Sequence, residues 1–206
     1  MPKPRGPNVL HDVQVRRRGV LAVVAILFVA VFALVASPGG WSQTAVVYAG
    51  RLAICICILG RCWCTLYIGG RKARQLVDTG PYSISRNPLY FFSFVGTFGF
   101  GAQTGSLSVA LFCTILVWIV FRRLVGKEEQ HLIGALGEPY KHYLTTTPRF
   151  LPNPGKWRGV DVLEVQPRLV VRTFFDGLMF LAAVPIALGF AWLQQNDMLP
   201  VLLQLP

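Results

Sequence analysis

A polar stretch, residues 80–90, stands directly before an apolar segment and carries groups suited to an anion. Arg86 presents a planar fork of N–H donors that matches a carboxylate. Pro88 suits the first position of a helix, and the backbone N–H groups of that first turn would be directed at the same ligand. Alternatively, the stretch only caps the helix while Arg86 extends to the surface. The sequence leaves both interpretations open.

Two adjacent acids form the second candidate. Glu128 and Glu129 are two of only nine acidic residues, and they follow an apolar run in a region rich in Lys and Arg. One of the two carboxylates could bind a cation or a ribose hydroxyl. The alternative is that both lie in the first turn of a helix, where the macrodipole favours acids. His131 and His142 are expected to be surface residues.

The elements that must position these residues are long and apolar. Hydrophobic residues make up 53% of the 206 positions and charged residues only 14%, against about 25% charged in soluble domains. Long runs of hydrophobic residues account for this composition, and they predict helices that cross a bilayer. We predict one all-α domain over residues 1–206, an integral membrane helical bundle of about five transmembrane helices. The expected spans are 20–36, 44–68, 88–102, 106–122 and 173–193, with a kink at Pro185 in the last.

Basic residues occupy alternate connections between the predicted spans. Of the 20 Lys and Arg, five precede the first span, four lie between the second and third, and nine lie between the fourth and fifth. This positive-inside pattern predicts a protein of the cell membrane with a cytoplasmic N-terminus and its C-terminus on the opposite side. A nucleic-acid partner would not require such alternation, so the net charge of +11 does not indicate one.

Segments 88–102 and 106–122 are joined by so short a connection that they must form an antiparallel hairpin. The hairpin returns Glu128 to the membrane face that carries Arg86, so one ligand could touch both. Gly96, Gly99 and Gly101 are expected to let the two helices of the hairpin approach closely. Residues 128–144 show apolar side chains at helical spacing, which predicts a helix at the membrane interface, broken near Gly137 and Pro139, that closes over the hairpin.

Two arginines, Arg51 and Arg61, lie inside the second predicted span. An arginine at the bilayer centre costs about 2.5–3.5 kcal/mol, so we expect both to snorkel to opposite interfaces. The alternative for Arg61 is that it turns inward to a site. Four cysteines of the same span form two Cys-x-Cys pairs, whose geometry on a helix does not close a four-thiolate site, and we interpret them as small packing residues rather than metal ligands.

Taken together, these motifs resemble those of the isoprenylcysteine carboxyl methyltransferase and phospholipid methyltransferase superfamily. The resemblance covers roughly residues 75–152, and its specificity lies in the order, spacing and placement of the motifs. The matching residues are Gly80, Tyr82, Arg86, Asn87, Pro88 and Tyr90, then Glu128, Glu129 and Leu132, then Gly137, Tyr140 and Tyr143, and finally residues 148–152.

The resemblance implies a membrane-embedded methyltransferase that uses S-adenosyl-L-methionine without a Rossmann domain. It places the cofactor at the cytoplasmic end of the hairpin, in residues 71–90 and 123–152, enclosed by the C-terminal segment. Arg86 and Arg123 would be the catalytic residues; Arg123 is the nearest match to an arginine that assists the substrate in family enzymes. The implied cofactor contacts are Gln75, Leu76, Val77, Tyr82, Asn87, Pro88, Leu89, Tyr90 and Glu128.

The expected reaction is methyl transfer to a lipid-like or amphipathic substrate that enters from the bilayer. An isoprenylcysteine-type carboxylate, a phospholipid-type amine and a small thiol all stay open as acceptors. Asn87 stands where the isoprenylcysteine branch commonly has histidine, which weakens the case for that substrate. The alternative is a non-catalytic membrane protein, a scaffold or transport-associated subunit on the same fold.

Overall fold

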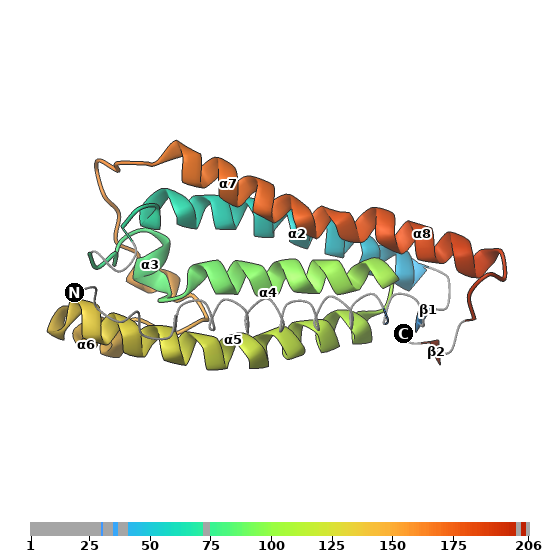
Figure 1. Ribbon diagram of the computed structural model, residues 1–206, viewed down its shortest axis with the longest axis horizontal. Coiled ribbons are helices and arrows are strands. Elements are labelled where there is room, and N and C mark those ends of the chain that lie inside the picture. Colours follow the sequence, from blue (N-terminus) through green and yellow to red (C-terminus); the bar gives the residue numbers. More distant parts are fainter. Residues whose placement is uncertain (1–29, 31–34, 37–40, 72–74, 201–202, 205–206) are drawn as a thin grey trace, which may run out of the picture.

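The computed structural model describes residues 30, 35–36, 41–71, 75–200 and 203–204, and these form an elongated bundle of helices (Figure 1). Over that part of the chain the only strands are β1 (Val35–Ala36) and β2 (Leu203–Gln204), which pair in parallel. The all-α prediction is therefore confirmed. The helices are α2 (Trp41–Ile68), α3 (Pro81–Ile84), α4 (Pro88–Gly101), η1 (Ala102–Thr104), α5 (Leu107–Leu136), α6 (Glu138–Thr146), η2 (Pro154–Lys156), α7 (Pro167–Leu178), η3 (Met179–Ala182) and α8 (Ala183–Gln195).

Three helical stretches among the described residues are long and apolar enough to cross a membrane: α2, α5 and the stretch Pro167–Gln195 formed by α7, η3 and α8. α4 is shorter, with 14 residues, and it packs against both α2 and α5. These correspond to the second to fifth predicted spans. The first predicted span, 20–36, lies outside the described residues except for residue 30 and β1.

The stretch Pro167–Gln195 loses regular α-helical geometry at η3, immediately before Pro185. Proline has no N–H for the carbonyl four residues earlier, and its ring presses against that carbonyl. The local tightening into a 3-10 turn is the break that Pro185 predicts.

The central contact of the bundle joins α2 and α4 through small residues. A side chain at Gly96 would collide with Cys57, and one at Gly99 would collide with the backbone oxygen of Gly50. Only Gly101 faces α5, where it meets Ala110. The close approach expected of these glycines is therefore real, but two of the three serve the contact with α2 rather than the hairpin. Small residues allow such approach because no side chain separates the backbones.

Helix α5 continues without a break from Leu107 to Leu136, about fourteen residues beyond the predicted end of its span. Glu128 and Glu129 thus lie within a continuous helix, and the interpretation that they cap a helix N-terminus is wrong. The predicted interface helix is in fact the last turns of α5 followed by α6, with the break at Gly137 as expected. Leu132 and its neighbours continue the helical phase of the span, which explains why no new helix begins.

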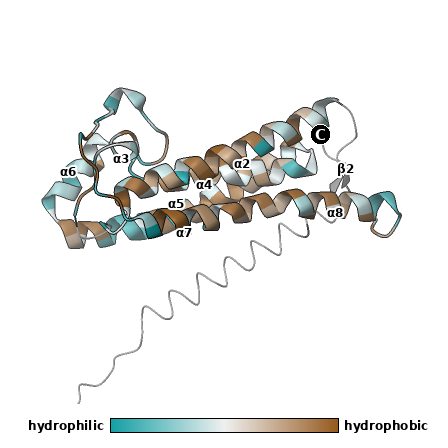
Figure 2. Cartoon of the chain, turned by 90° about the horizontal axis from the view of Figure 1, so that it is seen from above, coloured by the Kyte–Doolittle hydropathy of each residue, from teal (hydrophilic) through white to brown (hydrophobic). Residues whose placement is uncertain are grey.

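Charge is collected at one end of the bundle, here called the site end, which carries α3 and α6. Every described Lys and Arg other than Arg51 and Arg61 lies in residues 71–86 or 122–172, at this end. Figure 2 shows hydrophobic residues along the middle of the long helices and hydrophilic residues around α3 and α6. The chain is thus an integral membrane protein whose polar residues lie mainly at one end.

The two arginines within α2 behave differently. Arg51 lies over the ring of Tyr48, 5.2 Å from its centroid. Arg61 turns into the bundle, where its Nη1 donates to Ser93 Oγ on α4 at 2.6 Å. The expectation that Arg61 snorkels is therefore wrong, because its guanidinium group is engaged by a hydroxyl on the facing helix.

Candidate functional site

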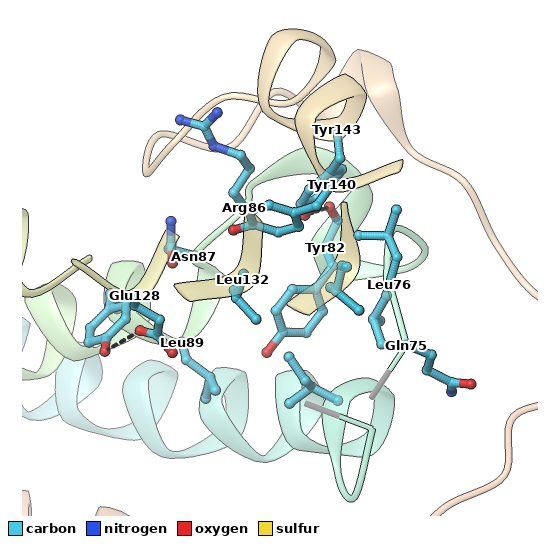
Figure 3. Close-up of a pocket in the computed structure, with 14 residues that line it drawn as sticks. Gln75, Leu76, Tyr82, Arg86, Asn87, Leu89, Glu128, Leu132, Tyr140 and Tyr143 are labelled. Atoms are coloured by element: carbon cyan, nitrogen blue, oxygen red, sulfur yellow. Dashed lines mark hydrogen bonds between the residues drawn. The ribbon is translucent and has the colours of Figure 1, made fainter. Parts of the chain in front are cut away.

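A cavity opens at the site end, between the last turn of α2, the first turn of α4, the end of α5 and α6 (Figure 3). Together with its mouth it encloses about 620 Å³ that no protein atom fills. Its wall is mostly apolar, with a few polar groups. The lining residues are Ile68, Gln75, Leu76, Val77, Tyr82, Arg86, Asn87, Leu89, Tyr90, Glu128, Leu132, Leu136, Tyr140 and Tyr143.

Eight of the nine residues carried over as cofactor contacts line this cavity. The exception is Pro88, which is buried at the first position of α4 and fixes the start of that helix. The structure thus brings residues from four separate elements to one wall, as the hairpin topology predicts.

Glu128 reaches the cavity from α5 and meets the first turn of α4. Its Oε2 accepts a hydrogen bond from the hydroxyl of Tyr90 at 3.0 Å (Figure 3). The ring of Tyr90 in turn packs edge-on against Phe121, with 4.9 Å between centroids. The carboxylate is therefore held at a defined place on the cavity wall by a neighbour that is itself packed.

Arg86 also lines the cavity, but its charge is directed at protein groups. Its Nε lies 3.4 Å from Glu129 Oε1, and its Nη1 donates to the carbonyl of Leu144 at 2.5 Å. In Figure 3 its guanidinium group points away from Tyr82 and Glu128. The carboxylate that matches the fork of Arg86 is thus Glu129, one residue from the one that faces the cavity.

Glu129 is the centre of a buried ion cluster. Its side chain is 9% exposed and it accepts hydrogen bonds from both Nε and Nη2 of Arg149, in addition to its ion pair with Arg86. A single carboxylate therefore pairs with two guanidinium groups that come from different segments. The hydrogen bonds and charge of Glu129 raise the pKa of Arg149.

Arg123, the second residue expected to be catalytic, is not brought to the cavity. It is exposed on α5 and does not line the wall. Five residues separate it from Glu128, which is about 140° around a helix with 3.6 residues per turn. The continuous helix that places Glu128 on the wall therefore turns Arg123 away from it.

Hydrogen bonds along its length join the C-terminal segment 148–158 to residues 80–87. The backbone N–H of Arg86 donates to Pro148 O at 2.8 Å, and the Asn87 amide donates to Arg149 O at 3.1 Å. At the other end, Gly80 N donates to Arg158 O at 2.7 Å. This segment holds residues 80–87 in place, but none of its residues lines the cavity; the wall on the C-terminal side comes from Tyr140 and Tyr143 of α6.

Three tyrosines of the cavity have raised pKa values because they are buried. Burial raises the pKa of Tyr82 and Tyr143 well above the usual value, and it raises the pKa of Tyr140 to about 12. Tyr143 uses its hydroxyl to donate to the carbonyl of Tyr82 at 2.6 Å. Tyr82 is only 4% exposed, and its own hydroxyl has no hydrogen-bond partner among the described residues.

Gly80 makes the turn that positions Tyr82. Its φ is +58°, and a side chain there would collide with the ring of Tyr67. We predict that Gly80→Ala destabilises the protein by about 1–3 kcal/mol, because alanine strains this backbone and no room exists for its methyl group. Thermal melting in detergent measures the effect.

The matched control is Gly134→Ala, since Gly134 lies inside α5 with open space around it. There alanine should be neutral or stabilise by up to about 1 kcal/mol. Equal melting temperatures for the two variants would refute the prediction.

Six lining residues were not among the carried-over cofactor contacts, one of them the expected catalytic Arg86: Ile68, Arg86, Leu132, Leu136, Tyr140 and Tyr143. The last two belong to the motif that carries the resemblance, and Leu132, Leu136 and Tyr140 recur at intervals of four, which is the spacing of one helix face. That periodicity was the signal for them. Ile68 gave no signal, because the last residue of an apolar span looks like any lipid-facing residue.

Comparison with known proteins gives a consistent result. Residues 58–138 match the family described as Phospholipid methyltransferase. The chain is 32% identical to the nickel-cobalt-cadmium resistance protein NccN of Alcaligenes xylosoxydans xylosoxydans, over 97% of each chain. It is 32% identical to the cobalt-zinc-cadmium resistance protein CzcN of Cupriavidus metallidurans, over 74% of this chain and 70% of that one.

A more distant relative is the protein-S-isoprenylcysteine O-methyltransferase of Schizosaccharomyces pombe, with 27% identity over 39% of this chain and 34% of that one. No solved structure matches the chain.

Proposed function

The chain belongs to the isoprenylcysteine carboxyl methyltransferase and phospholipid methyltransferase superfamily, and we propose that its cavity binds S-adenosyl-L-methionine and transfers the methyl group to an amphipathic acceptor. The observation that carries the proposal is the meeting of eight expected cofactor contacts on one cavity wall. Seven of these residues lie between positions 75 and 90, in α3, α4 and the adjoining loops, and the eighth, Glu128, comes from α5.

The residues of the cavity suit the proposed cofactor. An adenine ring needs apolar and aromatic surface, which Leu89, Leu132 and Tyr140 offer. The amino acid part carries an ammonium group beside a sulfonium, and the Glu128 carboxylate supplies an anion on the same wall. The Tyr82 hydroxyl is a buried polar group without a partner in the part of the chain that the structure describes, and such groups usually receive one.

When bound, the cofactor would supply an activated methyl group on a sulfonium. In the transfer, an electron pair of the acceptor forms the new bond to carbon, the carbon–sulfur bond breaks, and its electrons stay on sulfur. No oxyanion develops, so the chain's residues need to orient the reactants and exclude water. Such orientation is worth about 7–11 kcal/mol in well-aligned cases. The apolar and aromatic side chains of Leu132, Leu136 and Tyr140 on the cavity wall would provide the exclusion.

The acceptor is proposed to enter from the bilayer with its reacting group at the site end. A carboxylate or thiolate would need no base. An amine would have to lose a proton, and Glu128 is a carboxylate on the cavity wall that can take it. We further propose that the site end is cytoplasmic and that the protein lies in the cell membrane, on the basis of the basic residues gathered there.

A second candidate function is a non-catalytic membrane protein that retains the fold. One observation favours it: two relatives with 32% identity bear names that refer to metal resistance and to no reaction. Bound cofactor would discriminate the two candidates, since a scaffold has no use for it.

Calorimetric titration of the detergent-purified protein with S-adenosylhomocysteine tests the proposal. We expect saturable binding with one site per chain. A protein that melts cooperatively but binds neither S-adenosylhomocysteine nor the methyl donor would rule out the methyltransferase. Incubation with isotope-labelled donor and lipid or thiol extracts, followed by mass spectrometry, then identifies the methylated acceptor.

A further inference from the structure

The polar cluster around Arg61 lies within the membrane-spanning part of α2 and is not used by the cofactor site. Arg61 Nη1 donates to Ser93 Oγ at 2.6 Å, and Ser93 is itself only 6% exposed. The next turn of α2 adds Thr65, whose hydroxyl bonds to the Arg61 carbonyl and to Thr173 on α7. The guanidinium thus has one hydroxyl partner, on α4, and two further hydroxyls, from α2 and α7, bond to each other beside the Arg61 backbone carbonyl.

The charge of Arg61 has no counter-ion among the described residues. Its Nε is buried and makes no hydrogen bond there, and Nη1 has a neutral hydroxyl as its partner. An arginine in the hydrophobic part of a membrane is costly, and such residues mark substrate or ion sites. A buried cation of this kind is stabilised when an anion joins it.

The position of Arg61 relates it to the cavity. It lies seven residues before Ile68, which is about 10 Å along α2 toward the far end of the bundle, and Ser93 lies four residues after Leu89, about 6 Å along α4. Ile68 and Leu89 both line the cavity. The pair therefore stands one to two helical turns below the cavity floor, on the side of the bilayer.

Tyr82 adds a buried polar group at the cavity, above the Arg61–Ser93 pair. It is buried, lines the cavity and leaves its hydroxyl without a partner among the described residues. Figure 3 shows the hydroxyl pointing away from Tyr143, toward the side of the cavity where Leu89 lies. Tyr82 thus offers a polar group to a ligand on the side of the cavity from which α4 runs to Ser93.

We propose that Arg61 and Ser93 form an anion-binding subsite for the phosphate or carboxylate group of the amphipathic acceptor, one to two helical turns closer to the bilayer than its methyl-accepting atom. The inference rests on the proposed function, which supplies the statement that the part of the acceptor held in the cavity is its methyl-accepting atom. It favours acceptors whose anionic group and methyl-accepting atom are separate groups, since the anion at Arg61 is displaced from the cavity that would hold the donor.

Binding of dodecyl phosphate to the protein in a neutral maltoside detergent tests the subsite. We expect dodecyl phosphate to bind the wild type and Arg61→Gln to bind it at least about tenfold more weakly, as the loss of one charge-assisted contact predicts. Arg51→Gln is the matched control, because it removes the other arginine of α2 and should change the affinity by less than about twofold. Arg61→Lys, which keeps the charge, should retain part of the binding.

Three results would overturn the inference: wild-type affinity in Arg61→Gln, an equal loss in Arg51→Gln, or no binding of dodecyl phosphate by the wild type. Binding of inorganic phosphate is measured separately. If inorganic phosphate binds as tightly as dodecyl phosphate, the site binds a free anion, and the proposal of an amphipathic acceptor is overturned. If Arg61→Gln does not fold, Ser93→Ala replaces it, with a several-fold loss of affinity expected and unchanged affinity contradicting the subsite.

Titration with S-adenosylhomocysteine on the same samples separates the two proposals. Cofactor binding without dodecyl phosphate binding overturns the subsite alone. Dodecyl phosphate binding that depends on Arg61, without any cofactor binding, supports the anion site and overturns the methyltransferase.

Discussion

The Glu129→Gln variant is expected to lose about 3 kcal/mol of stability and to bind S-adenosylhomocysteine poorly. Glu129 is buried and forms ion pairs with both Arg86 and Arg149. Removal of one partner from a buried ion pair costs about 3–5 kcal/mol, because the remaining charge is left uncompensated. Glutamine keeps an acceptor oxygen and Arg149 is partly exposed, so the lower end of that range applies. Thermal melting and denaturant titration in detergent measure the loss.

The matched control is Glu138→Gln. Glu138 pairs with Lys141 at 2.6 Å on the surface of α6, and both side chains are exposed. Surface pairs are worth about 0–1 kcal/mol, so this variant should melt close to the wild type. The double variant Glu129→Gln, Arg149→Gln should recover part of the loss. If Glu129→Gln melts like Glu138→Gln, the cluster does not hold the site end together.

The Glu128→Gln variant is expected to keep its stability but lose about tenfold to a hundredfold in cofactor affinity. Glu128 lies on the cavity wall and receives a hydrogen bond from Tyr90, which glutamine can still accept. What the substitution removes is the negative charge, and hydrogen bonds to charged groups contribute about 1.5–3 kcal/mol. Calorimetric titration with S-adenosylhomocysteine and with the methyl donor measures both affinities.

Comparison of the two ligands locates the contact. The ammonium and ribose groups are common to both, whereas only the methyl donor carries a sulfonium. An equal loss places Glu128 at the amino acid or ribose part, and a loss confined to the donor places it at the sulfonium. Lys127→Gln, a neighbouring exposed position, should bind both ligands normally. Unchanged affinities in Glu128→Gln would remove this residue from the cofactor site.

Much of the site could be predicted because topology and local motif agree. The short connection after Gly101 forces a hairpin, and the hairpin alone returns Glu128 to the first turn of α4, where it meets Tyr90. Pro88 marked the start of α4 correctly, since a proline is tolerated at that position. These are consequences of helix length and chain direction, which the sequence states directly.

Other features depend on contacts between segments that no local pattern reveals. The helical phase of α5 decides which of the two adjacent glutamates faces the cavity. The prediction ended this helix at residue 122, so the phase could not be extended to residues 128 and 129. The partner of Arg86 proved to be Glu129 because Arg149 reaches the same carboxylate from the C-terminal segment. Likewise, Arg61 turns inward because Ser93 faces it from α4. The sequence of α2 alone does not tell whether a residue of this helix faces lipid or another helix.

The stacking of Trp157 on Trp63, with 5.7 Å between centroids and 23° between ring planes, joins the C-terminal segment to α2. Rings in such contact influence each other's excited states, so their separation would change the tryptophan fluorescence and the near-ultraviolet circular dichroism of the protein. Either signal, followed during titration without any attached dye, would report whether the C-terminal segment moves away from α2 when a ligand binds.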